Sequence, residues 1–214
     1  MQNQSMGKGM SVLNKKEILK RLKSDDSNQR LIITPILDEK NQLDGPGVDL
    51  RLSNQFTIFR MENISHINVG DTREFKIGKV QREVVIPFGK TLILHPKTLV
   101  LGSTLEYVAM PKDLVGTLEG RSSWARLGLL IATACAIDPG FKGCITLELS
   151  NLGNLPLYLI PGIRLAKLIL SPTTSASNYS KKRKYFSQIG PEFSKASQDK
   201  DLKIFYPRKK KDSN

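Results

Sequence analysis

Short apolar segments of strand length, separated by turn residues, follow one another along most of this chain. They lie at positions 31–36, 48–52, 56–59, 84–86, 92–94 and 99–101, and again at 144–150, 157–160 and 163–170. Glycine and proline mark the turns between them, most clearly at 45–47, 87–89 and 161–162. Many short strands with frequent glycine and proline turns predict a mainly β domain, either a sandwich or a barrel-like fold.

The two ends of the chain depart from this pattern. Asn14 and Glu17 have the spacing of a capping box, and Ile18, Leu19 and Leu22 would form the apolar stripe of a short helix. Positions 24–30 look disordered, and after residue 172 the composition becomes polar and basic. We therefore expect a disordered leader at 1–10, a β domain at 11–172, an arm at 173–198 and a basic tail at 199–214.

One apolar segment carries an acid. At 145–149 the alternation of apolar and polar positions puts three apolar side chains on one face of a strand, and Thr146 and Glu148 on the other. Such an acid is either solvated or held in a pocket for chemistry. A polar turn just upstream, at 121–126, carries two hydroxyls and two guanidiniums, and its presence favours the pocket.

The charge of the chain narrows the range of partners. The formal net charge is +13, and from Tyr179 to the end 11 Lys or Arg stand against 4 Asp or Glu. Basic runs suit polyanions such as nucleic acid, an acidic membrane surface or a nucleoside triphosphate, although the run at 208–211 is equally typical of a solvated tail. Phe205 and Tyr206 are the only aromatic residues of that tail, so nucleic acid is not an expected partner.

The sequence also argues against several classes of protein. No apolar stretch approaches the ~18 residues of a membrane span, and Cys135 and Cys144 form no disulfide framework, so we expect a reducing, cytoplasmic location. His66 and His95 lie near no Cys or carboxylate at metal-ligand spacing. The zinc deaminase signature, a glycine-rich phosphate loop and a nucleophile elbow are all missing. We expect no protein-bound catalytic metal and no zinc.

Four central segments, at 121–128, 133–134, 137–143 and 145–151, together closely resemble the dCTP deaminases of the trimeric dUTPase-like superfamily. Further matches at 47–52, 94–96, 161–165, 184–185, 188 and 190–191 extend the resemblance over roughly residues 10–195. It implies a distorted jelly-roll or β-barrel of dUTPase-like (β-clip) type, with a short N-terminal helix and a C-terminal lid arm. It also implies a homotrimer with active sites at subunit boundaries, and hydrolysis of dCTP to dUTP and ammonia.

The chemistry of that reaction fits the polar residues. Deaminating cytosine without zinc requires a base that activates water for attack at C4 and an acid that protonates the leaving amine. One carboxyl can do both if partial burial raises its pKa, and Glu148 is the candidate. Arg126 could pair with this carboxylate or stabilise the tetrahedral intermediate. The resemblance implies that Ser122 and the carbonyl of Ala134 orient the water, although a lone serine there would more often cap a helix.

The resemblance also implies a nucleotide-binding set. Arg121, Ser122 and Ser123 would hold the phosphates, and Asp138 would contact the deoxyribose unless it only initiates the turn before Pro139. The C-terminal arm would add Tyr179, Lys184 and Gln188. The remaining members of the set are Trp124, Ala125, Arg126, Thr146, Leu147 and Glu148. We expect Mg²⁺ to arrive with the triphosphate rather than on dedicated protein ligands, and dTTP is a candidate inhibitor.

Two alternatives stay open at this point. A bifunctional relative would also cleave the triphosphate and form dUMP directly, and Asp138 could activate a water for that step. A non-catalytic nucleotide sensor is the second, because the segment at 131–134 lacks the histidine that family members usually carry and the interval from Arg126 to Asp138 is one residue short. A pure dUTPase is disfavoured, since its glycine-rich C-terminal motif is absent and Phe141 stands where dUTPases usually have tyrosine.

Overall fold

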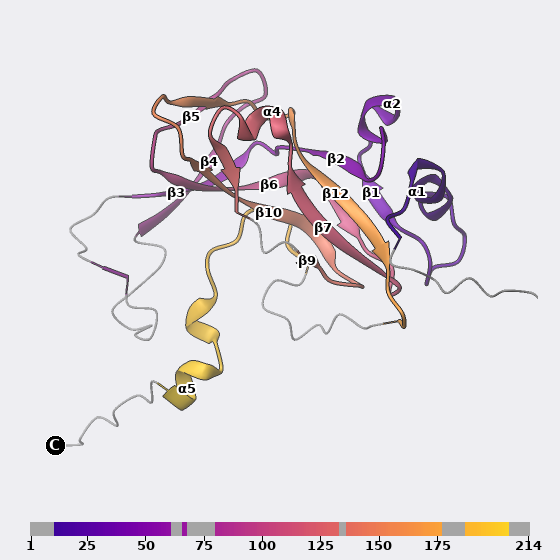
Figure 1. The fold of residues 1–214 in the computed structure, drawn as a ribbon. Helices are drawn as coiled ribbons and strands as arrows, with labels where there is room; N and C mark the ends of the chain where they lie inside the picture. Colours follow the sequence, from indigo (N-terminus) through magenta and orange to yellow (C-terminus); the bar gives the residue numbers. More distant parts are fainter. Residues whose placement is uncertain (1–10, 61–65, 68–79, 133–135, 177–186, 206–214) are drawn as a thin grey trace, which may run out of the picture.

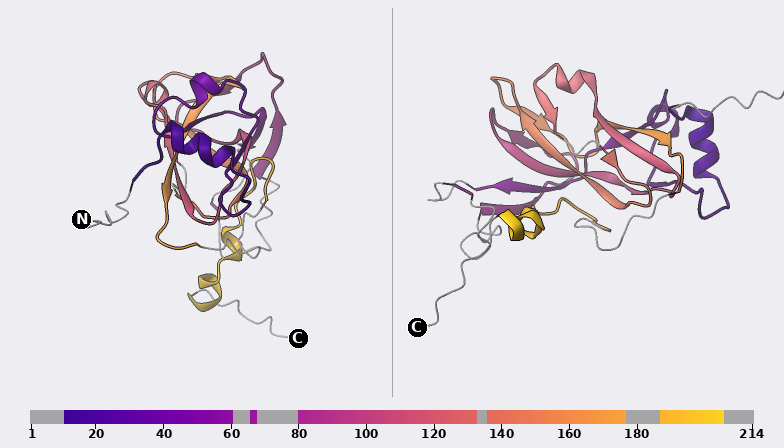
Figure 2. Two further views of the ribbon diagram at one scale, coloured as in Figure 1. Left: turned by 90° about the vertical axis from the view of Figure 1, so that its right-hand side faces the viewer. Right: turned by 60° about the horizontal axis from the view of Figure 1, so that its bottom comes forward.

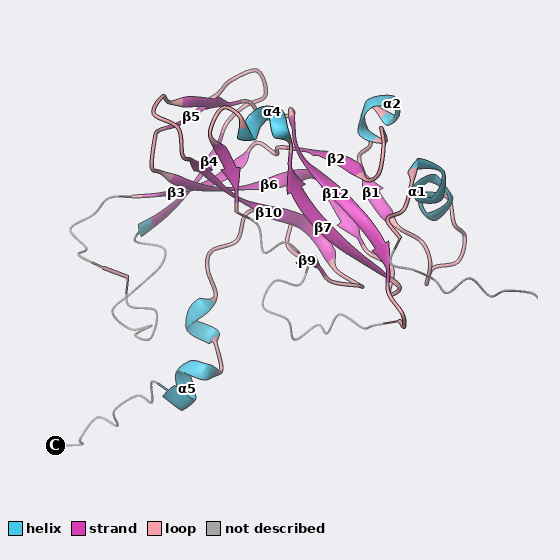
Figure 3. Ribbon diagram, in the orientation of Figure 1, coloured by secondary structure: helices cyan, strands magenta, loops and turns pink. Residues whose placement is uncertain are grey.

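The structure, a computed structural model, describes residues 11–60, 66–67, 80–132, 136–176 and 187–205. Its strand residues far outnumber its helical residues, and the strands are arranged as two larger sheets and one short strand pair (Figure 3). The mainly β class predicted from the sequence is therefore confirmed. Within the described ranges no sheet path closes on itself, so the fold is jelly-roll-like and not a closed barrel.

The larger sheet is built around two long antiparallel strands, β6 (Leu99–Ala109) and β10 (Lys142–Asn151). The order is β4-β3-β6-β10-β8, and β1 pairs with the C-terminal end of β6. The flanking strands are β1 (Ile32–Thr34), β3 (Gln55–Phe59), β4 (Gln81–Val85) and β8 (Leu129–Ile131). This sheet carries the strand on which the candidate acid lies.

The second sheet has the order β2-β12-β7-β9, and a short pair joins β5 to β11. Its strands are β2 (Val48–Arg51), β7 (Leu114–Gly120), β9 (Ala136–Ile137) and β12 (Arg164–Pro172), and the pair consists of β5 (Leu92–Leu94) and β11 (Leu157–Leu159). Leu50, Leu147 and Leu168, from strands of both sheets, belong to one buried core. The alternating apolar positions of the strands thus meet in a single hydrophobic interior.

Helices lie at the edges of the sheets (Figures 1 and 2). Helix α1 (Lys15–Leu22) begins at the predicted capping box, in which Asn14 Oδ1 accepts from Glu17 N at 3.1 Å and the Glu17 carboxylate accepts from Asn14 N at 2.9 Å. We expected residues 24–30 to be disordered, but the structure shows an ordered turn there. The N–H groups of Gln29 and Arg30 both donate to the Asp26 carbonyl. The short helix η1 (Ala196–Gln198) and helix α5 (Asp201–Phe205) lie away from the sheets in Figure 1.

Strand β6 continues well past the predicted segment at 99–101, through polar residues buried in the core. The pairing of β6 with β10 shifts register between residues 144 and 146 of β10, which marks a β-bulge. The Thr104 hydroxyl supplies hydrogen bonds to the backbone there: it accepts from Ile145 N at 2.9 Å and donates to Glu106 O at 2.8 Å. The Glu106 carboxylate is fully buried and accepts from Arg51 N at 2.8 Å and Gln42 Nε2 at 2.9 Å. Burial raises the pKa of Glu106 above its ordinary value.

Candidate active site

Glu148 lies on the polar face of β10, as the alternation predicts. Leu147 and Leu149 on either side of it point into the core, while Thr146 and Glu148 are half-buried on the opposite face. Within the described residues Glu148 Oε2 is buried and has no hydrogen-bond partner. Burial therefore raises the pKa of the Glu148 carboxyl above its ordinary value of 4.5, because the charged form loses hydration.

The C-terminal segment brings a second polar side chain to this face. Gln188 is buried against β10, where its Nε2 donates to Thr146 Oγ1 and to Cys144 O, both at 3.0 Å. Its backbone pairs there too, since Cys144 N donates to Gln188 O at 2.8 Å and Ser187 N to Lys142 O at 2.9 Å. The structure thus brings together three predicted residues, Thr146, Glu148 and Gln188.

Glycine at position 143 makes this docking possible. Gly143 has φ +146° and forms an isolated parallel bridge with Gln188. A Cβ atom there would lie 2.7 Å from the Gln188 carbonyl oxygen and 3.0 Å from its nitrogen. A side chain at 143 would therefore collide with the docked arm as well as strain its own backbone.

Strand β8 pairs with β10 next to Glu148. Ala132 N donates to the Glu148 carbonyl at 2.9 Å, just before the segment that contains Ala134. Ala134, Tyr179 and Lys184 lie outside the described residues, as do the leader at 1–10 and residues 206–214 of the basic tail. Their predicted roles stay predictions.

The polar turn at 121–126 forms the single-turn helix α4 (Ser122–Ala125) directly after β7. Arg121 holds the N-cap position with extended backbone, so Ser122 is the first helical residue and not a cap. Ser122, Ser123, Ala125 and Arg126 are exposed, whereas Trp124 packs against the core and its Nε1 donates to Arg164 O at 3.1 Å. The exposed side chains of α4 are thus available to a second molecule.

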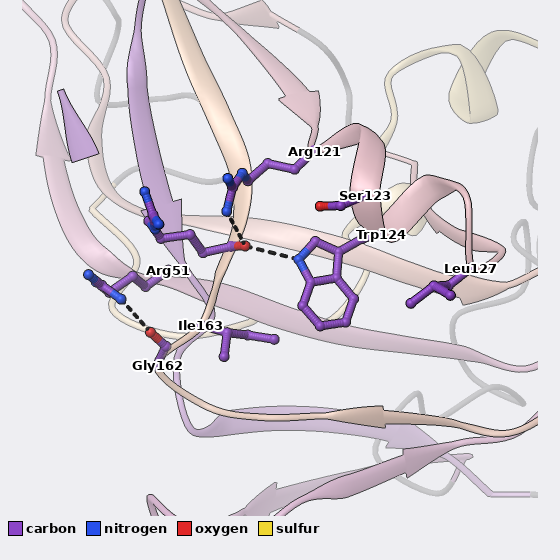
Figure 4. Close-up of a pocket in the computed structure, with 8 residues that line it drawn as sticks. Arg51, Arg121, Ser123, Trp124, Leu127, Gly162 and Ile163 are labelled. Carbon is purple, nitrogen blue, oxygen red and sulfur yellow. Dashed lines mark hydrogen bonds between the residues drawn. The ribbon is translucent and has the colours of Figure 1, made fainter. Parts of the chain in front are cut away.

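A cleft of about 450 Å³ lies beside α4 (Figure 4). Three neighbouring strands build it, because β2 ends at Arg51, β12 begins at Arg164 and β7 leads into Arg121. The lining residues are Arg51, Arg121, Ser123, Trp124, Leu127, Gly162, Ile163 and Arg164. Arg121 and Ser123, predicted to hold phosphates, thus share one cleft, and such a cluster of guanidiniums suits a polyanion.

Behind this cleft lies Asp49, which the sequence reasoning missed. Its side chain is only 4% exposed and forms ion pairs with Arg121, Arg164 and Lys167. The signal was available, since Asp49 interrupts the apolar segment at 48–52 in the same way as Glu148 interrupts its own strand. Arg51 and Arg164 were also missed, because only the order of the strands brings them beside Arg121.

Three further predicted residues, Asp138, Leu147 and Arg126, lie in different surroundings. Asp138 is half-buried and begins the turn before Pro139, where its carbonyl accepts from Phe141 N at 3.1 Å. Because the Leu147 side chain lies in the core, only its backbone is left for a ligand. In the described part of the chain no hydrogen bond or ion pair joins Arg126 to Glu148, so the predicted pairing of these two residues is not formed within one protomer.

Two negative findings apply to the described residues. No three His, Cys, Asp or Glu side chains among them are grouped so as to hold a metal ion. None of their helices is long and apolar enough to cross a membrane.

The family model and the related proteins that this chain matches all point to one family. A family model described as dCTP deaminase-like matches residues 12–173. A dCTP deaminase of Halorubrum lacusprofundi is 40% identical over 89% of this chain and 94% of that protein. A protein of Methanobrevibacter smithii named "dCTP deaminase, dUMP-forming" is 36% identical over 91% of this chain and 100% of that protein.

A solved structure supports the fold. The crystal structure of the 2'-deoxycytidine 5'-triphosphate deaminase from Agrobacterium tumefaciens matches with a TM-score of 0.57 and 20% sequence identity, over 76% of this chain and 46% of that one. At this identity the match bears on the fold alone. It confirms the jelly-roll-like β fold that the sequence resemblance implied.

Proposed function

This chain belongs to the dCTP deaminase-like family, and we propose that it hydrolyses dCTP to dUTP and ammonia with Glu148 as the proton-transferring group. The observation that carries the proposal is the half-buried Glu148 carboxyl on an otherwise apolar strand, with a raised pKa and an unpartnered oxygen. The reaction supplies dUTP, and hence dUMP, for thymidylate synthesis.

The environment of Glu148 suits both halves of the reaction. As carboxylate it takes a proton from the water whose oxygen attacks C4 of cytosine. It then gives that proton to the departing amine, so that water and dCTP become dUTP and ammonia. A carboxyl whose pKa is raised toward neutrality performs both transfers better than a fully solvated one. Glu148 can therefore activate the attacking water, a step that zinc performs in the zinc deaminases, and we expect no zinc requirement.

Ser122 and Arg126 would reach Glu148 from another subunit. Both are exposed, Ser122 at the start of α4 and Arg126 at its C-cap, and among the described residues no hydrogen bond or ion pair joins Arg126 to Glu148. We therefore propose a homotrimer in which α4 of one protomer faces β10 of the next, where Ser122 and the Ala134 carbonyl orient the water and Arg126 stabilises the intermediate. Exposed apolar side chains such as Tyr158 and Leu155, 63% and 76% exposed, supply surface for such an assembly.

The phosphates would bind in the cleft beside α4. Arg121 offers a forked donor and Ser123 a hydroxyl there, and the arm would add Tyr179, Lys184 and Gln188. Asp138 would contact the deoxyribose. We expect Mg²⁺ to enter on the phosphate oxygens of the nucleotide, and dTTP, which shares the sugar and triphosphate, to compete for the same site.

A second product is a separate candidate, because one relative is named as dUMP-forming. In that case the chain would also cleave the triphosphate after deamination, with Asp138 positioned to activate a water. The free, buried thiol of Cys144 supports a reducing compartment, and we propose that the protein works in the cytoplasm.

One assay tests these proposals. The full chain is incubated with dCTP and Mg²⁺, and the products are resolved as dUTP, dUMP or none. Formation of dUTP supports the simple deaminase and formation of dUMP the bifunctional enzyme, whereas binding of dCTP without turnover would identify a nucleotide sensor. Parallel reactions with a zinc-selective chelator should be unaffected, and those without Mg²⁺ should slow. Loss of turnover on removal of stoichiometric zinc would contradict the mechanism.

A further inference from the structure

The cleft beside α4 has an unusual balance of charge. Three guanidinium groups line it, from Arg51, Arg121 and Arg164, and none of the described carboxylates does. Arg51 and Arg164 are direct partners across β2 and β12. Like charges in this position destabilise a sheet. A negative group nearby would offset this repulsion.

Asp49 supplies only part of that charge. Its Oδ2 lies 3.4 Å from Arg121 Nε and 3.4 Å from Arg164 Nη1, and its Oδ1 lies 3.1 Å from Lys167 Nζ. One buried carboxylate thus faces three cations, two of which, Arg121 and Arg164, line the cleft. Because it contacts both arginines through the same oxygen, Asp49 also fixes where the two guanidiniums stand relative to each other.

Both arginines keep donors for a ligand. Arg164 uses Nη1 for Asn41 O at 2.6 Å and for Asp49, and Arg121 uses Nε for Asp49 and Nη1 for Arg164 O at 3.4 Å. In the described structure Nη2 of neither side chain has a partner. Each guanidinium has five N–H donors in a fixed fork, the geometry that binds phosphate oxygens in pairs.

We propose that Arg164 is a further phosphate-binding residue and that Asp49 is the positioning residue that aligns Arg164 with Arg121 for the terminal phosphates of the nucleotide. This inference rests on the proposed function, which already places phosphates at Arg121 and Ser123. It adds a second strand, β12, to the phosphate site. It also predicts selectivity for triphosphates over monophosphates, because Arg164 contributes only when the terminal phosphates are present.

The first test is Arg164→Gln in the full chain, with Arg21→Gln as a matched control. Both arginines are ion-paired to an aspartate and partly exposed, but Arg21 pairs with Asp113, away from the cleft. By calorimetry Arg164→Gln should weaken dCTP binding about tenfold, as loss of ~1.4 kcal/mol of charge-assisted hydrogen bonding produces. It should leave dCMP binding within about twofold, and Arg21→Gln should change neither. Equal loss for dCTP and dCMP, or no loss for dCTP, would overturn the role of Arg164.

The second test is Asp49→Asn. The direction in which dCTP affinity changes shows whether Asp49 acts by aligning the arginines or only through its negative charge. If Asp49 acted only through its negative charge, removing that charge would tighten anion binding. If it aligns Arg121 and Arg164, dCTP binding weakens while kcat at saturating dCTP stays within a few-fold. Tighter binding would refute the positioning role. Should Asp49→Asn fail to fold, Arg164→Lys decides: it keeps the charge but loses the fork, and must still weaken dCTP binding.

Binding of inorganic tripolyphosphate tests the phosphate site separately from deamination. If wild-type protein binds tripolyphosphate and Arg164→Gln weakens that binding, the phosphate site stands even if no ammonia is released from dCTP. If dCTP is deaminated normally but Arg164→Gln leaves the affinity for both dCTP and tripolyphosphate unchanged, the deaminase stands and the inference falls.

Discussion

At the scale of single residues, the proposed function depends on acids that interrupt apolar strands. Glu148 and Asp49 both lie in such strands, but they differ in what surrounds them. Asp49 faces three cations, whereas Glu148 Oε2 has no partner in the described residues. A paired carboxylate holds neighbouring side chains in place, and an unpaired one is free to exchange a proton.

Glu148→Gln should abolish deamination and leave dCTP binding largely intact. The amide keeps the size and shape of the side chain but cannot shuttle a proton, so kcat should fall by roughly 10²–10⁴-fold or more. Ammonia release and calorimetric titration measure the two effects. Glu83→Gln, on the exposed face of β4, is the control and should keep normal turnover. Turnover of Glu148→Gln within a few-fold of wild type would remove this residue from the mechanism.

The pH dependence of kcat should report the same group. Because burial raises the pKa of Glu148 above 4.5, its carboxyl stays protonated to a higher pH than a solvated glutamate. The base form is lost as the pH falls through that raised pKa, so the acid limb of the kcat profile should lie above pH 4.5. Circular dichroism at each pH shows whether the fold persists. A limb at or below 4.5 in folded protein would assign it to another carboxyl.

At the scale of elements, buried polar side chains tie the strands and helices together. Gln42, at the end of α2 (Glu39–Gln42), is fully buried and makes four hydrogen bonds. It accepts from the N–H groups of residues 37 and 38, and donates to Asp49 O and to the Glu106 carboxylate. It thereby joins α2 to β2 and β6, next to the Asp49 that pairs with two arginines of the cleft beside α4.

Gln42→Met should cost at least about 3 kcal/mol of unfolding free energy, because it leaves several buried polar groups without partners at ~1–3 kcal/mol each. Denaturant unfolding of the full chain measures this loss. Gln29→Met, at an exposed position of the turn at 24–30, is the control and should change stability by no more than about 0.5 kcal/mol. Equal stability of the two variants would mean that the hydrogen bonds of Gln42 contribute little.

The same buried polar groups explain where sequence reasoning succeeded and failed. Segments with a simple apolar pattern, such as 163–170, were predicted to within two residues at each end. β7 was missed because Gly116 and Gly120 break its apolar pattern, and most of β6 because its buried polar residues read as surface. Glu148 could be placed from local alternation alone. The arginine cleft could not, because it depends on which strands are neighbours.

At the scale of the whole molecule, the candidate site residues come from several separate elements of the chain. Glu148 lies on β10 of the larger sheet with Gln188 docked against that strand, and the cleft beside α4 lies at the end of the smaller sheet. Among the described residues no hydrogen bond or ion pair joins Arg126 to Glu148. Assembly and the C-terminal arm are therefore both expected to contribute to binding.

Truncation after residue 172 should leave a folded oligomer that binds dCTP poorly. The core of the β domain does not include the arm, but Gln188 and its backbone contacts with β10 would be lost. Light scattering measures the assembly and nucleotide titration the affinity, with removal of 208–214 alone as the control that should scarcely change either. Undiminished dCTP affinity after the longer truncation would show that the arm is not part of the site.

The contact at Gly143 has a consequence for how such chains can diverge. An L-residue at this position is disfavoured by the backbone angle and, separately, by the Gln188 carbonyl 2.7 Å from its Cβ. The second constraint exists only while the arm is docked. In a lineage that dispensed with the arm, selection on residue 143 would therefore relax, and we expect this glycine and the arm to be retained or lost together.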